Sequence, residues 1–492
     1  MKITFVFPDI FLPWDFFNYN GGSFGHGVAS LSAVLKKAGH NTSLIHITRE
    51  ISSKEFQEKL IVLKPDLIAF SSTTFLFPIV QKYALAAKKI SKTPIICGSF
   101  HSTLYPEEVL KDKNIDMICM GEGEAALLEL CDKMEKDEDI TNIESIWTKK
   151  EGKIYKNKVR PCIVELDRLP FPDREIFDYQ NIYQKEVAAF SFFRGCPYNC
   201  TYCCAPALRK IYPNPQNYIR HRSPQSALNE IKEVIKRYPF IKYIRFEDYL
   251  ISDNKEKTKE WIKEFSQLYQ KEVNLPILSV NIHTDLIDNE ILSLLKKAKI
   301  IFLKISIESG NNFILKEVLQ KNTTIKEIKN AFKMIKKAEI KTITYNILGL
   351  PGEGAKEILD TIKLNAKISP ELAIACIYYP FKGTALYNTC LQKNFIKDET
   401  IEISKDHFYQ VLSLPTIRKK QIGFFYLYFQ TIKNLYNLLF KISFSWPLIL
   451  LADKILTFKY APELIEITPR FLKSAIANIL KKQKKGKEPE IY

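Results

Sequence analysis

Residues 194–203 read Arg194-Gly195-Cys196-Pro197-Tyr198-Asn199-Cys200-Thr201-Tyr202-Cys203, directly after a predicted strand at residues 188–193. The cysteines have the spacing CxxxCxxC, and they form the one tight group among ten cysteines. Gly195 and Pro197 favour a tight loop at the carboxyl end of the strand, where the chemistry of βα-barrels takes place. In a chain that we expect to lack a signal peptide, such a group indicates a metal rather than disulfides.

Three thiolates can hold three irons of a four-iron cubane and leave the fourth iron open. An open metal position binds a substrate-like ligand, and S-adenosylmethionine (SAM) offers an amine and a carboxylate. One electron from such a cluster would break a carbon–sulfur bond of SAM and give a 5′-deoxyadenosyl radical. We therefore predict that Cys196, Cys200 and Cys203 are metal ligands. The alternative is a zinc knuckle or inert cysteines, but zinc requires a fourth ligand at matched spacing, and Cys204 is interpreted as an ordinary buried cysteine.

A series of strands and helices begins at this segment. Six predicted strands alternate with helical patterns, which is typical of an open, partial (β/α)6 barrel. Ser223 before Pro224 predicts an N-cap followed by a helical first-turn proline. The strands are expected at residues 188–193, 243–246, 278–282, 302–307, 342–347 and 372–377, and the helices at 224–237, 255–270, 289–298, 325–338 and 357–368.

An earlier series occupies residues 2 to about 135 and predicts a doubly wound, Rossmann-like sheet. Ligands in such sheets bind beyond the carboxyl ends of the strands. Small residues at Ser71–Thr74, Gly98–His101 and Gly121–Glu124 would let a large ligand approach the backbone there. The strands are expected at residues 3–7, 41–47, 67–71, 94–97 and 117–120, and the helices at 28–38, 77–90 and 122–134.

Several short motifs follow one another in a fixed order. They are Gly98-Ser99-Phe100-His101-Ser102-Thr103, Pro106-Glu107-Glu108-Val109-Leu110, Asp116 through Glu124, Leu169-Pro170-Phe171-Pro172, Ser306-Ile307-Glu308-Ser309-Gly310 and Leu348-Gly349-Leu350-Pro351-Gly352-Glu353. In this order they resemble the motifs of radical SAM proteins with an N-terminal cobalamin (B12)-binding domain, over roughly residues 1–390. The resemblance implies a [4Fe–4S] cluster, SAM and cobalamin as cofactors.

The resemblance also implies two sets of binding residues. Carboxylates after the second barrel strand would accept hydrogen bonds from the amine of SAM; the alternative is an exposed acidic turn. Alternation along the fourth strand would aim Ser306 and Glu308 at one face, and a structural hydrogen bond is the competing interpretation, as packing is for Tyr202. The SAM-binding candidates are Tyr202, Glu247, Asp248, Ser306, Glu308 and Gly349. The cobalamin-binding candidates are Ser71, Ser72, Thr73, Gly98, His101, Gly121, Glu122 and Gly123.

The chain departs from the family pattern at several positions. The fingerprint DxHxxG is absent from residues 1–140, so we expect cobalamin to bind without a histidine ligand. Ser99 replaces a glycine, and His283 and Lys321 stand where relatives have arginine. His26 is interpreted as a loop histidine with no metal role; the alternative is that it approaches the ligand.

The formal charge of +17 is carried mostly by lysines spread along the chain, which indicates a solvated surface and no nucleic-acid partner. Residues 395–492 are expected to be helical. Their interpretation is a helical cap on the barrel; the alternatives are a lid over an apolar substrate or a membrane-surface helix beside the basic tail Lys481–Lys487. Residues 442–452 are too short to span a bilayer. The expected domains are 1–140 for cobalamin, a Pro-punctuated linker at 141–185, the radical SAM barrel at 186–394, and 395–492.

Three functions remain open. The first is a cobalamin-dependent radical SAM methyltransferase acting on an unactivated carbon. The second uses the same radical chemistry for ring formation, oxidation or rearrangement. The third is a non-catalytic iron–sulfur or cobalamin sensor, against which a full set of SAM motifs argues. For either enzyme we expect a cytoplasmic location, a small-molecule substrate and an electron donor such as flavodoxin or ferredoxin.

Overall fold

The computed structural model describes residues 1–10, 22–179, 181–182, 184–250, 254–396 and 411–463. The chain divides into two compact units, which are described in turn. The first contains Met1–Pro197 and Cys204–Ile244 with a short later segment, and the second contains the remainder.

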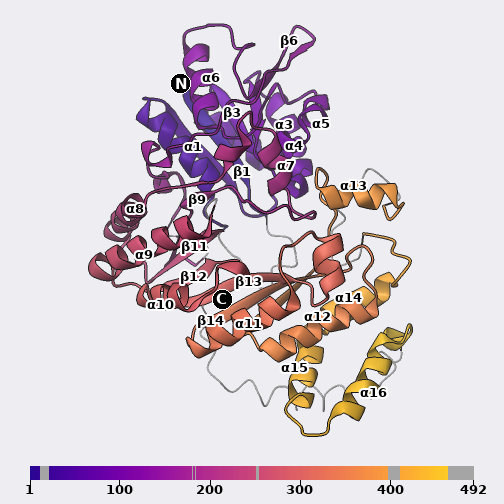
Figure 1. The fold of residues 1–492 in the computed structure, drawn as a ribbon. Coiled ribbons are helices and arrows are strands. Elements are labelled where there is room, and N and C mark those ends of the chain that lie inside the picture. The colour runs from indigo at the N-terminus through magenta and orange to yellow at the C-terminus, as the bar shows by residue number, and fades with distance from the viewer. Residues whose placement is uncertain (11–21, 180, 183, 251–253, 397–410, 464–492) are drawn as a thin grey trace. The chain divides into compact units, whose positions relative to one another are not determined.

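The first unit is built on a seven-stranded sheet of order β2-β1-β3-β4-β5-β6-β7, which belongs to the indigo and purple part of the chain in Figure 1. The first five strands in this order pair in parallel, and the last two add an antiparallel edge. The strands are β1 (Lys2–Pro8), β2 (Asn41–Ile47), β3 (Leu67–Ser71), β4 (Ile95–Gly98), β5 (Met117–Cys119), β6 (Ile146–Lys150) and β7 (Lys153–Tyr155).

Alternate side chains of these strands enter two separate cores, one on each face of the sheet. Val6 and Phe70 pack in one core with α2 (Ser53–Leu63), α3 (Phe77–Lys88) and α5 (Pro106–Lys111). The other core contains Phe5 and Ala69 and is covered by α1 (His26–Lys37) and α6 (Glu124–Glu135). The predicted doubly wound arrangement is therefore confirmed.

The edge hairpin β6–β7 was not anticipated. Glu151 and Gly152 join its strands and both have positive φ, 52° and 75°, which is the two-residue turn typical of tight hairpins. Lysines at the end of β6 and the start of β7 interrupt the alternation of apolar and polar residues that would predict two strands. Helix α2 was missed for a similar reason, since only Phe56 and Leu60 of its eleven residues are buried.

The rest of the first unit carries the start of the cysteine segment, up to Pro197, and resumes at Cys204. A two-stranded antiparallel ribbon pairs β9 (Phe193–Arg194) with β10 (Arg220–His221). Helix α7 (Ala205–Lys210) lies between them in sequence, and β8 (Val187–Phe190) and α8 (Pro224–Arg237) precede and follow them. Ser223 caps α8 as expected, its hydroxyl accepting a hydrogen bond from the Ser226 amide.

A six-stranded sheet has the order β15-β14-β13-β12-β11-β8, so its strands follow one another in chain order as the partial barrel requires. The pairs β12–β13, β13–β14 and β14–β15 are parallel. The strands after β8 are β11 (Tyr243–Tyr249), β12 (Ile277–Asn281), β13 (Ile300–Glu308), β14 (Lys341–Leu348) and β15 (Leu372–Ile377), and the helices are α9 (Lys255–Glu272), α10 (Asn289–Lys297), α11 (Ile325–Lys337) and α12 (Ala355–Ile368).

The C-terminal part of the second unit is helical, as predicted. Helix α13 (Ala385–Gln392) is followed by α14 (Lys419–Leu427), α15 (Phe429–Leu439) and α16 (Trp446–Thr457). Side chains of α14 and α15, including Phe425 and Tyr436, share one core with α12, and the three helices lie beside one another in Figure 1. The basic tail 481–487 and the pattern at 471–480 lie outside the described residues.

A buried carboxyl group closes the loop between β14 and α12. Glu353 is fully buried, and its Oε2 accepts hydrogen bonds from the Gly349 and Leu350 amides at 2.7 and 3.0 Å. Burial raises the pKa of Glu353 to about 8, although the two amides favour the charged form. This raised pKa favours the protonated form of Glu353 in the folded protein at neutral pH.

This predicts a pH-dependent stability. Between the ordinary glutamate pKa of 4.5 and about 8, the folded state holds a proton that the unfolded chain releases, so stability falls as pH rises through this window, by at most about 1.4 kcal/mol per pH unit. Glu353→Gln resembles the neutral acid and should flatten the curve. Denaturant unfolding across this window measures it, with the exposed Glu138→Gln as control; equal slopes for wild type and Glu353→Gln would contradict the assignment.

Candidate functional site

A cavity of about 570 Å³ opens in the first unit at the carboxyl ends of its parallel strands. Its volume is that of a small-molecule or cofactor pocket. The loops after β3, β4 and β5 form one wall through Ser71, Gly98, Ser99 and the run Gly121–Glu124, and His26, Gly27 and Ser30 of α1 complete it. The rest of the lining comes from later in the chain and contains Arg194, Gly195, Cys196, Cys204, Leu208, Tyr212, Tyr218, Arg220 and Arg222.

The structure places five of the eight predicted cobalamin-binding residues on this cavity, namely Ser71, Gly98, Gly121, Glu122 and Gly123. Ser72, Thr73 and His101 are not among its lining residues. His101 is buried because α4 (Phe100–Leu104) begins at once after β4, and its ring packs 4.4 Å from that of Phe77. The sequence could not show this early turn. His26 does line the cavity, from the first turn of α1.

Backbone conformation explains the glycines of this wall. Gly121 has φ +74°, and a Cβ there would lie 2.9 Å from the Tyr212 hydroxyl oxygen. Ser99, which replaces a family glycine, has φ 80° and ψ −164°, a region that glycine occupies almost exclusively. The chain thus keeps the glycine backbone with a serine side chain, and the wall remains a cradle of small residues suited to a large flat ligand.

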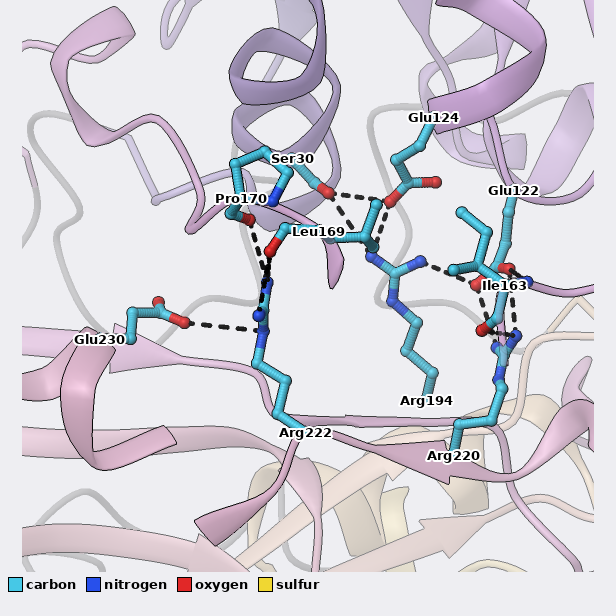
Figure 2. A network of polar contacts seen from close by, with 10 residues as sticks. All are labelled: Ser30, Glu122, Glu124, Ile163, Leu169, Pro170, Arg194, Arg220, Arg222 and Glu230. Carbon is cyan, nitrogen blue, oxygen red and sulfur yellow. Dashed lines mark hydrogen bonds and ion pairs between the residues drawn. The ribbon is translucent and has the colours of Figure 1, made fainter. Parts of the chain in front are cut away.

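Two acidic and two basic side chains form a network on the cavity wall (Figure 2). Arg194 donates to Glu122 Oε1 at 2.7 Å and to Glu124 Oε1 at 2.6 Å. Arg220 donates to both carboxylate oxygens of Glu122 at 3.0 Å, a bidentate geometry that arginine favours. Ser30 donates its hydroxyl to Glu124 at 2.8 Å.

The ribbon β9–β10 explains why both arginines meet the acids. Arg194 and Arg220 are directly paired across the two strands, and paired residues present their side chains on the same face. Glu124 is the first residue of α6, where the helix dipole favours a carboxylate. One short ribbon therefore fixes the arginine that precedes Gly195-Cys196 against the loop after β5.

The network is charged. Burial disfavours the charged forms, but Glu124 and Glu122 outweigh it and raise the pKa of Arg194. For Glu124, burial alone would raise the pKa, but Arg194 and Ser30 outweigh burial and hold the pKa of this carboxyl below its ordinary value. Both groups therefore stay ionised across the neutral range.

A third arginine of the ribbon holds the proline-rich motif. Arg222 donates to the Leu169 carbonyl at 3.2 and 3.3 Å and to the Pro170 carbonyl at 3.0 Å, and its Nε lies 4.0 Å from Glu230 (Figure 2). Since Leu169 and Arg222 also line the cavity, this motif is part of the cavity wall.

The cysteine loop begins at a position that only glycine can occupy without strain or a clash. Gly195 has φ +92°, and a Cβ there would lie 2.2 Å from the Tyr218 carbonyl oxygen. Arg209 then donates to the Cys196 and Pro197 carbonyls at 2.9 and 2.8 Å. The Cys196 carbonyl is thereby fixed at the cavity wall.

None of the four cysteines of the segment is in a disulfide, so their sulfur atoms offer the donor chemistry that an iron–sulfur cluster requires. The prediction for Cys204 is corrected: it is partly exposed and lines the cavity, because it sits at the turn before α7. Among the described residues, no three His, Cys, Asp or Glu side chains are grouped so as to hold a metal ion. The ligand set Cys196, Cys200 and Cys203 therefore stays a prediction.

In the second unit, Tyr202 and Glu308 are brought together. The Tyr202 hydroxyl donates to Glu308 Oε1 at 2.7 Å, and Lys321 Nζ lies 3.5 Å from the same oxygen. Burial, followed by the nearby Glu308, raises the pKa of Tyr202 well above its ordinary value. The buried carboxylate thus has the partners that its burial requires.

The expected alternation of Ser306 and Glu308 is wrong. The register of β13 against β14 shifts between them, and Glu308 has φ +68°. A bulge of this kind redirects the side chains, so Ser306 instead pairs with the Tyr249 hydroxyl at 2.7 Å. Such a bulge leaves no mark in an apolar–polar pattern.

The remaining SAM candidates lie at strand ends. Glu247 accepts a hydrogen bond from Arg245 at 2.6 Å, and Asn281 donates to the backbone carbonyls of Phe246, Glu247 and Asp248. Gly349 has φ +79° and directs its amide to Glu353. Lys304 is a further buried group near these candidates that the sequence analysis did not select. Burial lowers the pKa of Lys304 to about 8, although the nearby Glu247 acts to raise it. The available signal was its position on the same strand, two residues before Ser306.

His283 also gains a defined setting. Its ring stacks on Tyr198 of the cysteine loop at 4.2 Å, and its Nδ1 lies 2.9 Å from Asp285. Tyr198 donates its hydroxyl to the same carboxylate at 2.6 Å. His283 therefore packs against the loop that carries the cysteines.

Comparison with known proteins fits both units. Residues 190–364 match the family model of the radical SAM superfamily, and residues 23–131 match that of the B12 binding domain. The anaerobic magnesium-protoporphyrin IX monomethyl ester cyclase of Rubrivivax gelatinosus is 26% identical over 439 residues, which are 84% of this chain and 74% of the relative. An uncharacterized methyltransferase of Pyrococcus horikoshii is 25% identical over 415 residues, 81% of this chain and 87% of the relative.

The fold is shared with a solved structure. The cobalamin-dependent S-adenosylmethionine radical enzyme OxsB, with aqua-cobalamin and S-adenosylmethionine bound, superposes with a TM-score of 0.67 at 16% identity. The match covers 93% of this chain and 72% of that one. With both family matches, the predicted resemblance is confirmed: the chain belongs to the radical SAM superfamily, and a B12-binding domain precedes its radical SAM domain.

Proposed function

We propose that the protein is a cobalamin-dependent radical SAM methyltransferase that acts on an unactivated carbon of a small-molecule substrate. The observation that carries the proposal is the shared cavity, whose walls contain both the glycine loops of the B12-binding domain and Cys196 of the cysteine motif. A substrate in such a cavity would lie beside both cofactor sites. The methyltransferase of Pyrococcus horikoshii, of which the chain spans 87%, supports methyl transfer.

In this proposal each cofactor is held by its own set of residues. Cys196, Cys200 and Cys203 would hold the [4Fe–4S] cluster, and the loops at Ser71, Gly98 and Gly121–Gly123 would hold cobalamin within residues 1–140. When bound, the cluster supplies an electron that cleaves SAM, and cobalamin supplies a methyl group. The division into a linker at 141–185, a barrel at 186–394 and a helical region at 395–492 belongs to the same proposal.

The chain's own side chains would position these groups. Arg194, held by Glu122 and Glu124, keeps the start of the cysteine loop on the cavity wall. Tyr202 and Lys321 hold the Glu308 carboxylate, which is a hydrogen-bond acceptor suited to SAM's hydroxyl or ammonium groups. Apolar residues of the cavity, such as Phe5 and Leu127, would exclude water from a reactive radical.

The reductant and the compartment are further parts of the proposal. A cluster that passes one electron to SAM needs an electron carrier such as flavodoxin or ferredoxin. All ten cysteines lie in the described residues, and none of them forms a disulfide there, which fits a reducing compartment such as the cytoplasm.

A second candidate function is ring formation by the same radical chemistry. It is favoured by the similarity to the magnesium-protoporphyrin cyclase of Rubrivivax gelatinosus. The two reactions differ in the fate of SAM, since methyl transfer consumes a second SAM and releases S-adenosylhomocysteine, whereas ring formation does not.

The cluster ligands are tested by substitution. After anaerobic reconstitution, the wild type should bind about four irons per chain, as a cubane requires. Cys196→Ala, Cys200→Ala and Cys203→Ala should each lose the reduced-cluster electron paramagnetic resonance signal and 5′-deoxyadenosine formation. Cys204→Ala, also on the cavity wall, is the matched control and should retain both. Loss in Cys204→Ala together with retention in Cys203→Ala would overturn the ligand assignment.

The reaction is tested by the products of SAM. With reductant, SAM and hydroxocobalamin under anaerobic conditions, a methyltransferase should form S-adenosylhomocysteine as well as 5′-deoxyadenosine, and omission of hydroxocobalamin should remove only the former. Mass spectrometry of both products measures this. If 5′-deoxyadenosine forms and S-adenosylhomocysteine does not, ring formation is the better account.

A further inference from the structure

The exposed apolar side chains of the described residues are concentrated in one short stretch. Of 22 large apolar side chains that are exposed, 13 lie between Leu427 and Tyr460. Phe444 is 92% exposed and Trp446 65%. Soluble proteins scatter such residues singly, whereas a gathered set marks an interaction surface.

The packing of α15 and α16 leaves these side chains outside the core. Helix α15 buries Ile432, Tyr436 and Leu439. Helix α16 has twelve residues, of which only Leu456 is buried. Its apolar residues Trp446, Leu448, Leu450, Leu451 and Ile455 all face away from the core. We name the exposed side chains of residues 441–460 the α16 surface.

The α16 surface is basic. Lys441, Lys454 and Lys459 are exposed among the apolar residues. The two acidic residues near it already have partners: Asp453 accepts hydrogen bonds from the Lys363 ammonium and the Tyr436 hydroxyl, and Glu463 pairs with Arg418. From Arg418 to Glu463 the sequence holds seven basic and two acidic residues. The occupant should therefore be apolar and anionic.

This charge argues against two occupants from the chain itself. Residues 464–492 carry seven basic and three acidic residues, so this segment would bring positive charge to a positive surface. A second copy of the α16 surface would do the same. An anionic lipid bilayer offers both an apolar interior and negative headgroups.

We propose that the α16 surface docks the protein on an anionic lipid bilayer. Trp446 and Tyr460 would lie at headgroup level, where aromatic side chains are enriched, and Phe444 and Leu451 would enter the acyl boundary. The lysines would meet the lipid phosphates. A helix of this length lies in the interface plane, and in the described part of the chain no helix is long and apolar enough to cross a membrane.

Vesicle flotation of the full-length protein tests this proposal. The protein should float with phosphatidylcholine vesicles that contain phosphatidylglycerol, bind less at high salt, and bind pure phosphatidylcholine weakly. The triple variant Phe444→Ser/Trp446→Ser/Leu451→Ser should weaken binding by about tenfold or more, since three apolar anchors are lost. Lys441→Gln/Lys454→Gln/Lys459→Gln should weaken binding to the anionic vesicles alone.

The matched control removes exposed apolar residues elsewhere. Ile61 and Val62 on α2 are 57% and 79% exposed, and Ile61→Ser/Val62→Ser should bind vesicles as the wild type does. Unchanged circular dichroism of each variant shows that the fold is kept. The proposal is overturned if anionic vesicles are not bound, if the triple serine variant binds equally, or if light scattering shows a dimer that this variant dissociates.

Discussion

The charged contact between Arg194 and the pair Glu122–Glu124 is the constraint on which the site depends. It joins Arg194, the residue before Gly195-Cys196, to the loop that follows β5, and all of these residues line the same cavity. Loss of one partner of a buried ion pair costs about 3–5 kcal/mol, because the other charge is left uncompensated. Arg220 shares Glu122 and makes the set balanced, with two carboxylates and two guanidinium groups.

This network gives the two sequence motifs a common place. The glycine-rich turns after the strands and the start of the cysteine loop face the same space, although they lie some 70 residues or more apart in the chain. Ser99 shows how firmly that backbone is set: a serine occupies a conformation that normally requires glycine. The cavity is thus shaped by backbone and charge, which suits a large cofactor approached closely on one side.

Much of the fold could be predicted because its strands carry strong signals. Parallel strands such as Leu67–Ser71 and Leu372–Ile377 are short apolar runs between helical patterns, and their predicted bounds match the structure. The β6–β7 hairpin and α2 were missed because charged residues mask their pattern. In the site, five cobalamin candidates line the cavity, but His101 turns inward with α4, and the bulge before Glu308 ends the expected alternation. The role of Arg194 and Arg220 depends on the pairing of β9 with β10, and strands of two residues are too short to give a sequence pattern that predicts such a pairing.

The most direct measurement of the central claim is hydroxocobalamin binding to a protein whose cavity has been filled. A Cβ at Gly98 would meet its nearest atom only at 3.9 Å, so Gly98→Leu extends into the cavity without a backbone clash. Gly423 in α14 has no atom within 4 Å of a built Cβ and lies outside the cavity, so Gly423→Leu is the control. Anaerobic spectral titration should show binding by the wild type and Gly423→Leu and about tenfold or greater weakening in Gly98→Leu. Equal binding by Gly98→Leu and the wild type would contradict the account.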